Sequence, residues 1–159
     1  MMNFIYILSA CLLISYTTNA QSKKEIKKNK ISSVTVTETA GSKTINDSKT
    51  TYDENGEVVE KSEYNKDGLL KRTIKYKMNN LGDVIQEEEY DEKNTLKEKT
   101  VISYNANGDK KDELVYDSNS KLIKKHVYVY DKKGLKTERK TLDAAGKLIS
   151  TKKYTYTFK

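Results

Sequence analysis

Tyr130-Asp-Lys-Lys-Gly134 and Leu142-Asp-Ala-Ala-Gly146 are the two stretches that decide the fold. In each of them an aspartate opens a four-residue polar turn that ends in glycine. An Asp or Asn at the first position favours a type I turn, and the glycine then takes a left-handed backbone conformation as a G1 bulge. This combination closes a short loop between two antiparallel strands. The two stretches therefore predict two consecutive β-hairpins.

The same pattern extends toward the N-terminus over most of the chain. The residues that precede the turns are spaced by 12 or 14 positions: Tyr52, Tyr64, Tyr76, Tyr90, Tyr104, Tyr116, Tyr130 and Leu142. One turn, from Lys77 to Gly82, is longer, and Asn94 and Ser120 stand where other turns have glycine. A recurring spacing of this kind indicates a repeat architecture.

The segments between the turns have the composition of strands, because they are rich in β-branched and aromatic residues. We expect about ten strands, at 31–38, 44–52, 57–64, 69–76, 84–90, 95–104, 109–116, 121–130, 135–142 and 147–158. Short connections between consecutive strands predict an all-β fold, an antiparallel meander in a single twisted or curled sheet. Residues 21–159 contain only 27 Leu, Ile, Val and Phe, which is thin for a helical bundle or a doubly wound α/β domain.

The even spacing also predicts on which face the repeated tyrosines lie. Side chains alternate along a strand with a period of two. In a hairpin of this type each repeated residue should pair with the residue six positions later, and five of these seven partners are aliphatic: Val58, Leu70, Leu96, Leu122 and Leu148. We therefore expect all the repeated tyrosines on one face. They form a core if the sheet curls, and a half-apolar binding strip if it stays open.

The hairpin pattern at 130–134 and 142–146, followed by Tyr154-Thr-Tyr156, resembles the YD-repeat (RHS-type) family in a short secreted bacterial, Bacteroidetes-like form. In that family Tyr-Asp and glycine turns tile a long β-meander that winds into a shell or stalk. The similarity covers roughly residues 45–158. This chain has no Trp and is far too short to enclose a cargo. The resemblance implies a repeat-built β architecture and adds no catalytic residue.

Residues 1–20 predict a secretory signal peptide. They carry no charge, the run 3–16 is apolar, and Thr18-Asn19-Ala20 offers small residues for cleavage before Gln21. Leu8-Ser9-Ala10-Cys11 also matches a bacterial lipoprotein cleavage box, so lipidation of Cys11 and an uncleaved anchor remain alternatives. We expect cleavage near Ala20 and a secreted, periplasmic or cell-surface protein.

The charge is distributed unevenly along the rest of the chain. Residues 21–30 form a basic tether with five Lys and one Glu, and residues 31–159 form the β-repeat domain. Within that domain, residues 31–120 have 13 basic and 19 acidic side chains, whereas residues 121–159 have 12 and 3. The basic C-terminal third predicts contact with an anionic surface such as a glycan or lipid headgroups. We expect no nucleic-acid partner, because a secreted protein rarely meets one.

No pattern in the chain predicts catalysis, a cofactor or a metal site. His126 is the only histidine and lies mid-strand without a nucleophile beside it. Glu87 and Glu89 share one face of a strand, and such carboxylates more commonly discourage sheet stacking than bind cations. The turns at 53–56 and 105–109 faintly resemble calcium loops but lack EF-hand spacing. We expect a protein that is not an enzyme.

Tyr104, Tyr128 and Tyr130 are the candidate binding residues. Together they could line an aromatic strip, and exposed rings stack on sugar or peptide. The alternative is that these tyrosines only pack a lean sheet. The function expected from the sequence is a secreted or envelope-associated binding module for a glycan or a protein partner. A structural envelope protein that assembles through its sheet edges is the alternative.

Overall fold

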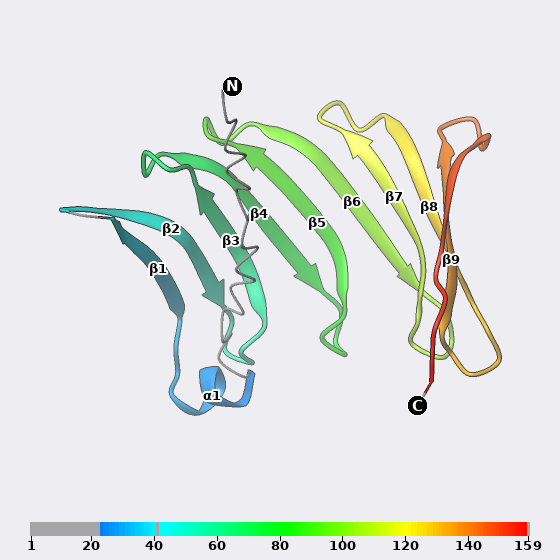
Figure 1. The fold of residues 1–159 in the computed structure, drawn as a ribbon, viewed down its shortest axis with the longest axis horizontal. Helices are drawn as coiled ribbons and strands as arrows, with labels where there is room; N and C mark the ends of the chain where they lie inside the picture. Colours follow the sequence, from blue (N-terminus) through cyan, green and yellow to red (C-terminus); the bar gives the residue numbers. More distant parts are fainter. Residues whose placement is uncertain (1–22, 41, 159) are drawn as a thin grey trace, which may run out of the picture.

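The computed structural model describes residues 23–40 and 42–158, which form a single open antiparallel sheet with one short helix at its end (Figure 1). The strands lie side by side in chain order, from β1 at one edge to β10 at the other. The helix is α1 (Lys23–Lys28), and the strands are β1 (Ser33–Ala40), β2 (Lys43–Tyr52), β3 (Val58–Tyr64), β4 (Leu70–Met78), β5 (Val84–Asp91), β6 (Leu96–Tyr104), β7 (Lys110–Asp117), β8 (Leu122–Tyr130), β9 (Lys136–Asp143) and β10 (Leu148–Lys153). The predicted all-β meander of ten strands is confirmed.

Eight turns from β2 to β10 share one hydrogen-bond pattern. The side-chain Oδ1 of the first turn residue accepts the backbone N–H groups two and four residues later, at 2.8–3.0 Å. These first residues are Asp53, Asn65, Asn79, Asp91, Asn105, Asp117, Asp131 and Asp143. The fourth residue has positive φ in every case, including Asn94 at 59° and Ser120 at 63°. The predicted turn chemistry is therefore confirmed, also where glycine is replaced.

The third of these turns is not longer than the others, contrary to our expectation. Asn79 opens it and Gly82 closes it, so Met78 rather than Tyr76 precedes the turn and pairs with Val84. With Met78 in that place, the spacing of the residues before the turns alternates strictly between 12 and 14. The structural repeat is therefore 26 residues long and comprises two strands.

An extra residue lies near the start of each strand that follows such a turn. In the β6–β7 pair, Tyr104 lies opposite Lys110 but Ser103 lies opposite Asp112, so Lys111 has no partner residue. The same register shift occurs in all eight pairs from β2–β3 to β9–β10. An unpaired residue of this kind is a β-bulge, and it reverses the alternation of side chains for the rest of the strand.

Because of these bulges, the prediction that the repeated tyrosines share one face is wrong. Tyr76 pairs with Glu87 and Tyr90 pairs with Thr73, and Thr73 and Tyr76 lie three positions apart on a regular part of β4. Tyr76 and Tyr90 therefore lie on opposite faces. Directly paired residues share a face, so the pairs can be followed from strand to strand across the sheet. They place five tyrosines on one face, here called the front face: Tyr52, Tyr76, Tyr104, Tyr128 and Tyr130. Tyr64, Tyr90 and Tyr116 lie on the back face.

The helix α1 lies within the stretch expected to be a basic tether. It packs against the turn between β2 and β3, where Ile26 is 1% exposed and lies next to Gly56. The predicted strand bounds agree with the structure to within about two residues, except that β10 ends at Lys153 rather than near 158. The helix therefore closes one end of the sheet near β2 and β3.

The apolar core is small, as the composition predicted. Among the described residues the buried apolar side chains are Ile26, Ile102 and Val115, and the last two lie on the front face. On the back face the buried hydroxyls of Ser62 and Thr73 form a hydrogen bond at 3.2 Å. A single layer of this kind depends mainly on cross-strand pairs, each of which contributes about 0.2–1 kcal/mol.

Candidate functional site

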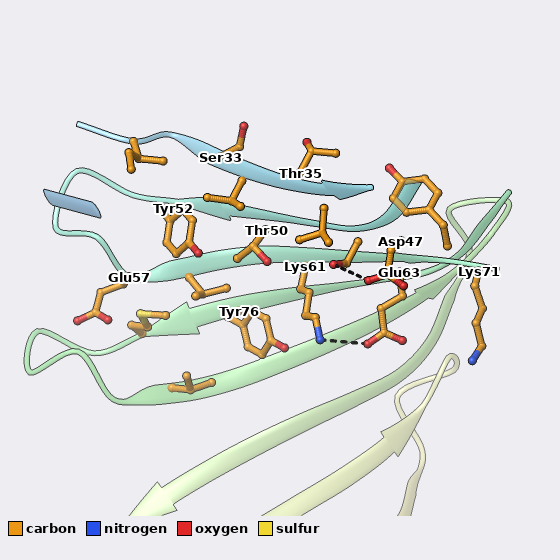
Figure 2. A pocket seen from close by; sticks show the side chains of 18 of the residues that line it. Ser33, Thr35, Asp47, Thr50, Tyr52, Glu57, Lys61, Glu63, Lys71 and Tyr76 are labelled. Atoms are coloured by element: carbon orange, nitrogen blue, oxygen red, sulfur yellow. Dashed lines mark hydrogen bonds and ion pairs between the residues drawn. The ribbon is translucent and has the colours of Figure 1, made fainter. Parts of the chain in front are cut away.

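A hollow of about 1250 Å³ lies on the front face of β1–β5 (Figure 2). Tyr52 and Glu57 lie at one end of it, and Asp47, Glu63 and Lys71 lie at the other. The strands position these groups simply, because alternate residues of each strand point to the same side. Val58, Met78 and Val84 add apolar surface beside Tyr52. The hollow thus combines apolar and polar surface.

Three tyrosines line the hollow, Tyr52, Tyr64 and Tyr76, and the register places two of them on the front face, Tyr52 from the end of β2 and Tyr76 from β4. Among the residues that the structure describes, neither of these two front-face hydroxyls has a hydrogen-bond partner, and both side chains are half-buried. Burial, and after it the negative charge of Glu87 and Glu63, raises the pKa of Tyr76 above its ordinary value. The Tyr76 hydroxyl is therefore protonated at neutral pH and can donate a hydrogen bond to a ligand.

An ion pair borders the rings. Lys61 Nζ lies 3.3 Å from Glu63 Oε1, and Arg72 Nε donates to Glu63 Oε2 at 2.9 Å. The hydrogen bond from Arg72 lowers the pKa of Glu63, although burial acts in the opposite direction. Arg72 Nη1 also reaches Glu89 at 3.3 Å. The hollow therefore offers an ionised carboxylate and an ammonium group within one short row of side chains.

The predicted binding residues Tyr104, Tyr128 and Tyr130 do come together on the front face, but on β6 and β8 outside this hollow. Their hydroxyls are used within the protein. Tyr104 donates to the carbonyl oxygen of Val84, and Tyr130 donates to that of Lys110, both at 2.8 Å. Tyr128 donates to Glu113 Oε2 at 2.8 Å. These contacts show that the three tyrosines help to hold the sheet together.

The hydroxyl-to-carbonyl contacts recur with the 26-residue repeat. Tyr156 donates to the carbonyl oxygen of Lys136 at 2.9 Å, which continues the series formed by Tyr104 and Tyr130. Each of these tyrosines reaches a carbonyl 20 residues earlier, at the first residue of the neighbouring odd-numbered strand. We call this contact the tyrosine strap. It ties the end of one strand to the start of the one before it.

Charged groups surround Tyr128. Lys110 Nζ donates to Glu113 Oε1 at 2.7 Å, and Lys136 Nζ lies 4.6 Å from the centre of the Tyr128 ring. Burial raises the pKa of Tyr128, and its hydrogen bond to Glu113 raises it further. Burial acts to raise the pKa of Glu113, but the hydrogen bonds from Lys110 and Tyr128 outweigh it and lower that pKa. This cluster is consequently an internal network of satisfied polar groups.

The other residues considered for chemistry lie apart from the hollow or are already engaged. His126 Nδ1 lies 3.0 Å from Thr141 Oγ1, and burial lowers the pKa of this histidine. Glu87 faces the front, and burial raises the pKa of its carboxyl group. The turn residues that resemble calcium loops, Asp53 and Asn105, use Oδ1 for backbone N–H groups. Within the described part of the chain, no group of three His, Cys, Asp or Glu could hold a metal ion.

Sequence reasoning missed Tyr52 and Tyr76 as site residues. Both belong to the repeated series, but nothing in that series distinguishes them from tyrosines whose hydroxyls are bonded. The signal that could have found them is Met78, which interrupts the row of tyrosines before the turns. A methionine has no hydroxyl, so the tyrosine strap is missing beside these two rings.

No protein-family model and no curated protein matches the sequence. Among solved structures, a porin-like protein from Bacteroides uniformis aligns with a TM-score of 0.40 and 14% identity over 78% of this chain and 44% of its own. A protein of unknown function from Bacteroides fragilis aligns with a TM-score of 0.40 and 16% identity over 80% and 96%. TarM from S. aureus aligns with a TM-score of 0.31 and 13% identity over 79% and 22%. The described residues contain no helix long and apolar enough to cross a membrane.

Proposed function

We propose that this protein is a secreted or envelope-associated, non-enzymatic binding module whose front-face hollow binds a glycan. The observation that carries the proposal is the pair of rings, Tyr52 and Tyr76, whose hydroxyls bond to none of the described residues, in an open hollow of about 1250 Å³. A ligand in this hollow would meet aromatic surface and hydrogen-bonding groups at the same time.

A sugar ring is a suitable ligand because it presents an apolar C–H face and a rim of hydroxyl groups. The C–H face can pack on a tyrosine ring, whose body is apolar and whose tip is polar. The hydroxyl groups can bond to the Lys61–Glu63 pair and to the free tyrosine hydroxyls. Ligand sites commonly combine apolar surface with a few polar groups in this way.

The proposal also includes export of the protein through a signal peptide and its relation to YD-repeat proteins. Residues 1–20, outside the described part of the chain, have the composition of a signal peptide with cleavage near Ala20. The tyrosine or leucine before an Asx turn supports kinship with YD-repeat proteins. The intact mass of the protein exported by a bacterial host should correspond to a chain that begins at or near Gln21. A lipid-modified Cys11 or a retained Met1 would contradict cleavage at Ala20.

The binding proposal is tested with a panel of soluble neutral and acidic polysaccharides, using isothermal titration calorimetry. We expect at least one polysaccharide to bind, and the variants Tyr52→Ala and Tyr76→Ala to weaken its affinity by tenfold or more, since each removes about 1.4 kcal/mol or more of stacking and hydrogen bonding.

The matched control is Tyr116→Ala, which removes the same side chain from the back face. It should leave affinity unchanged, and circular dichroism should show that all three variants remain folded. If Tyr116→Ala weakens binding as much as Tyr76→Ala does, or if no polysaccharide binds, the hollow is not a glycan site.

A further inference from the structure

The two edge strands of the sheet leave backbone groups without strand partners. Among residues 23–40 and 42–158, no segment pairs with the outer edge of β1 or with that of β10. An exposed edge of this kind is a template for pairing with another chain unless lysine, proline or a bulge protects it. β1 reads Ser-Val-Thr-Val-Thr-Glu-Thr-Ala, so it contains neither lysine nor proline, and the register shift in its pairing with β2, between Val36 and Thr37, places the extra residue, Asp47, on β2 rather than on the edge strand. This edge is open to pairing.

The edge at β10 carries exposed apolar side chains. Ile149 is 60% exposed, Tyr156 44% and Phe158 69%. The strand direction continues beyond Lys153, because Tyr154 N–H donates to the Thr137 carbonyl oxygen at 2.9 Å. An edge of at least seven residues, 148–154, is therefore available for a strand from outside.

The number of strands determines how two copies can join. Consecutive strands are antiparallel and there are ten of them, so β1 and β10 run in opposite directions. If a second copy is placed beside the first in the same orientation, its β1 lies antiparallel to β10 of the first copy. The joint then has the same geometry as every pair inside the sheet.

One register brings complementary side chains together on the same faces. Val36 and Glu38 lie on the front face, as do Lys152 and Tyr154, as the chain of paired residues across the sheet shows. Placing Glu38 opposite Lys152 then puts Val36 opposite Tyr154 and Val34 opposite Tyr156. Opposite charges and aromatic–β-branched pairs are the favourable cross-strand partners. In the same register Thr39 faces Thr151 on the back.

The net charges at the two ends of the sheet also differ in sign. Residues 31–64 carry seven acidic and three basic side chains, whereas residues 136–159 carry two acidic and seven basic ones. A joint between two β10 edges would bring Lys152 and Lys153 of one copy close to those of the other, which is unfavourable. A joint between β10 and β1 brings the basic end against the acidic end.

We propose that copies of this chain associate head to tail, with β10 of one copy pairing antiparallel with β1 of the next, so that Glu38 lies opposite Lys152. Such an interface is heterologous, because it joins two different surfaces and leaves one of each free for a further copy. The product is a continuous sheet in which every copy presents its hollow on the same side. The proposal does not depend on what the hollow binds.

The test uses charge reversal at the joint, with sedimentation velocity over a range of protein concentrations. The unmodified protein should increase in mean mass with concentration. Glu38→Lys and Lys152→Glu should each weaken association by about fivefold to tenfold, because each places like charges opposite one another. The double variant Glu38→Lys/Lys152→Glu should recover it. A mixture of the two single variants should also recover association, because every joint between unlike variants pairs opposite charges.

Matched controls are Glu54→Lys and Lys132→Glu, which make the same charge changes in exposed turns. They should associate as the unmodified protein does. The proposal is overturned if the unmodified protein stays monomeric at every concentration. It is also overturned if Lys152→Glu leaves association unchanged, which would indicate pairing of two β1 edges, or if the double variant stays as weak as the single ones.

Discussion

The front face has two halves built from the same 26-residue repeat, and they differ in what their tyrosines do. On β6–β9 the hydroxyls of Tyr104, Tyr128 and Tyr130 are all bonded within the protein. On β1–β5 the hydroxyls of Tyr52 and Tyr76 are unbonded among the described residues, and a hollow lies beside them. One half is filled by its own side chains and the other is open.

The difference follows from a single position in the repeat. Residues 52, 78, 104, 130 and 156 are equivalent, and they are Tyr, Met, Tyr, Tyr and Tyr. The last three form straps to the carbonyl oxygens of Val84, Lys110 and Lys136, whereas Met78 has no hydroxyl to give to Val58 and Tyr52 forms no strap within the described residues. The comparison indicates that a repeat sheet can keep an open hollow where one internal contact is missing.

The largest expected effect comes from the filled half. Ile102 is 4% exposed, and Ile102→Ala should lower the free energy of unfolding by about 2–4 kcal/mol, because it opens a cavity in the small core. The equivalent change in the open half, Tyr76→Ala, should cost less, since Tyr76 is half-buried beside the hollow. Urea unfolding of both variants measures the difference. Equal losses would show that the open half is packed as tightly as the filled one.

The helix α1 distinguishes the two halves at a turn. Gly56 has φ 78°, and an added Cβ would lie 2.9 Å from the Lys23 carbonyl oxygen, whereas nothing lies within 4 Å of one at Gly108. Gly108→Ala should cost about 1–2 kcal/mol from the left-handed backbone alone. Gly56→Ala should cost about 1 kcal/mol more, since the helix must shift. Thermal unfolding measures both, and an equal cost would mean that α1 does not pack here.

Removing one hydroxyl tests the network directly. Tyr128→Phe should lower stability by about 1–2 kcal/mol, because Glu113 loses a hydrogen bond at 2.8 Å to its charged carboxylate. Tyr76→Phe in the open half should leave stability nearly unchanged, since its hydroxyl has no partner within the described residues. Chemical denaturation of the pair gives the comparison. A loss at Tyr76 equal to that at Tyr128 would contradict the assignment of free and bonded hydroxyls.

A single substitution should make the open half resemble the filled half. Met78→Tyr places a hydroxyl where the other repeats have one, and a strap to the Val58 carbonyl oxygen should raise stability by about 0.5–1.5 kcal/mol. The same change should narrow the hollow and weaken any polysaccharide that binds there. Met78→Phe is the control, because it adds a ring without a hydroxyl. If Met78→Tyr raises stability but leaves polysaccharide binding unchanged, the missing strap is not what keeps the hollow open to a ligand.

The smallest expected effect is on acid stability. Glu113 has a pKa below its ordinary value of 4.5, so its carboxylate contributes stability above that value and loses it as pH falls through the folded pKa. Glu113→Gln should flatten the fall in stability between neutral pH and about pH 3. Urea unfolding midpoints at several pH values measure this slope. An unchanged slope would show that other carboxylates account for acid unfolding.

The sequence predicted the turns and the order of strands because their chemistry is local. In the turns between β2 and β10, an Asx residue followed three positions later by Gly, Asn or Ser forms the same hydrogen bonds, so seven of the eight turns could be placed, and nine of the ten strands could be ended to within about two residues. The sequence did not show which side chains lie on the front face and which on the back face. The extra residue differs from strand to strand, for example Lys97, Lys111 and Ile123, and in sequence it looks like any other strand residue.

The site was predicted only in part for a related reason. Tyr104, Tyr128 and Tyr130 were expected to lie together, and they do, but whether a hydroxyl is bonded depends on a carbonyl 20 residues away. The hollow depends on an interruption at Met78 that the assumed spacing concealed, since Tyr76 was taken as the residue before the turn. Local patterns define hairpins, whereas contacts between hairpins define the open half.

The order of strands has a consequence for how the chain folds. Each strand pairs only with its neighbours in sequence, so no strand pairing requires the closing of a long loop. Folding is fast when contacts are local, and in arrays of repeats stability is approximately a sum of units and of the interfaces between adjacent units. A hairpin of this chain can therefore close without waiting for distant parts of the sheet, and it becomes stable when a third strand joins it.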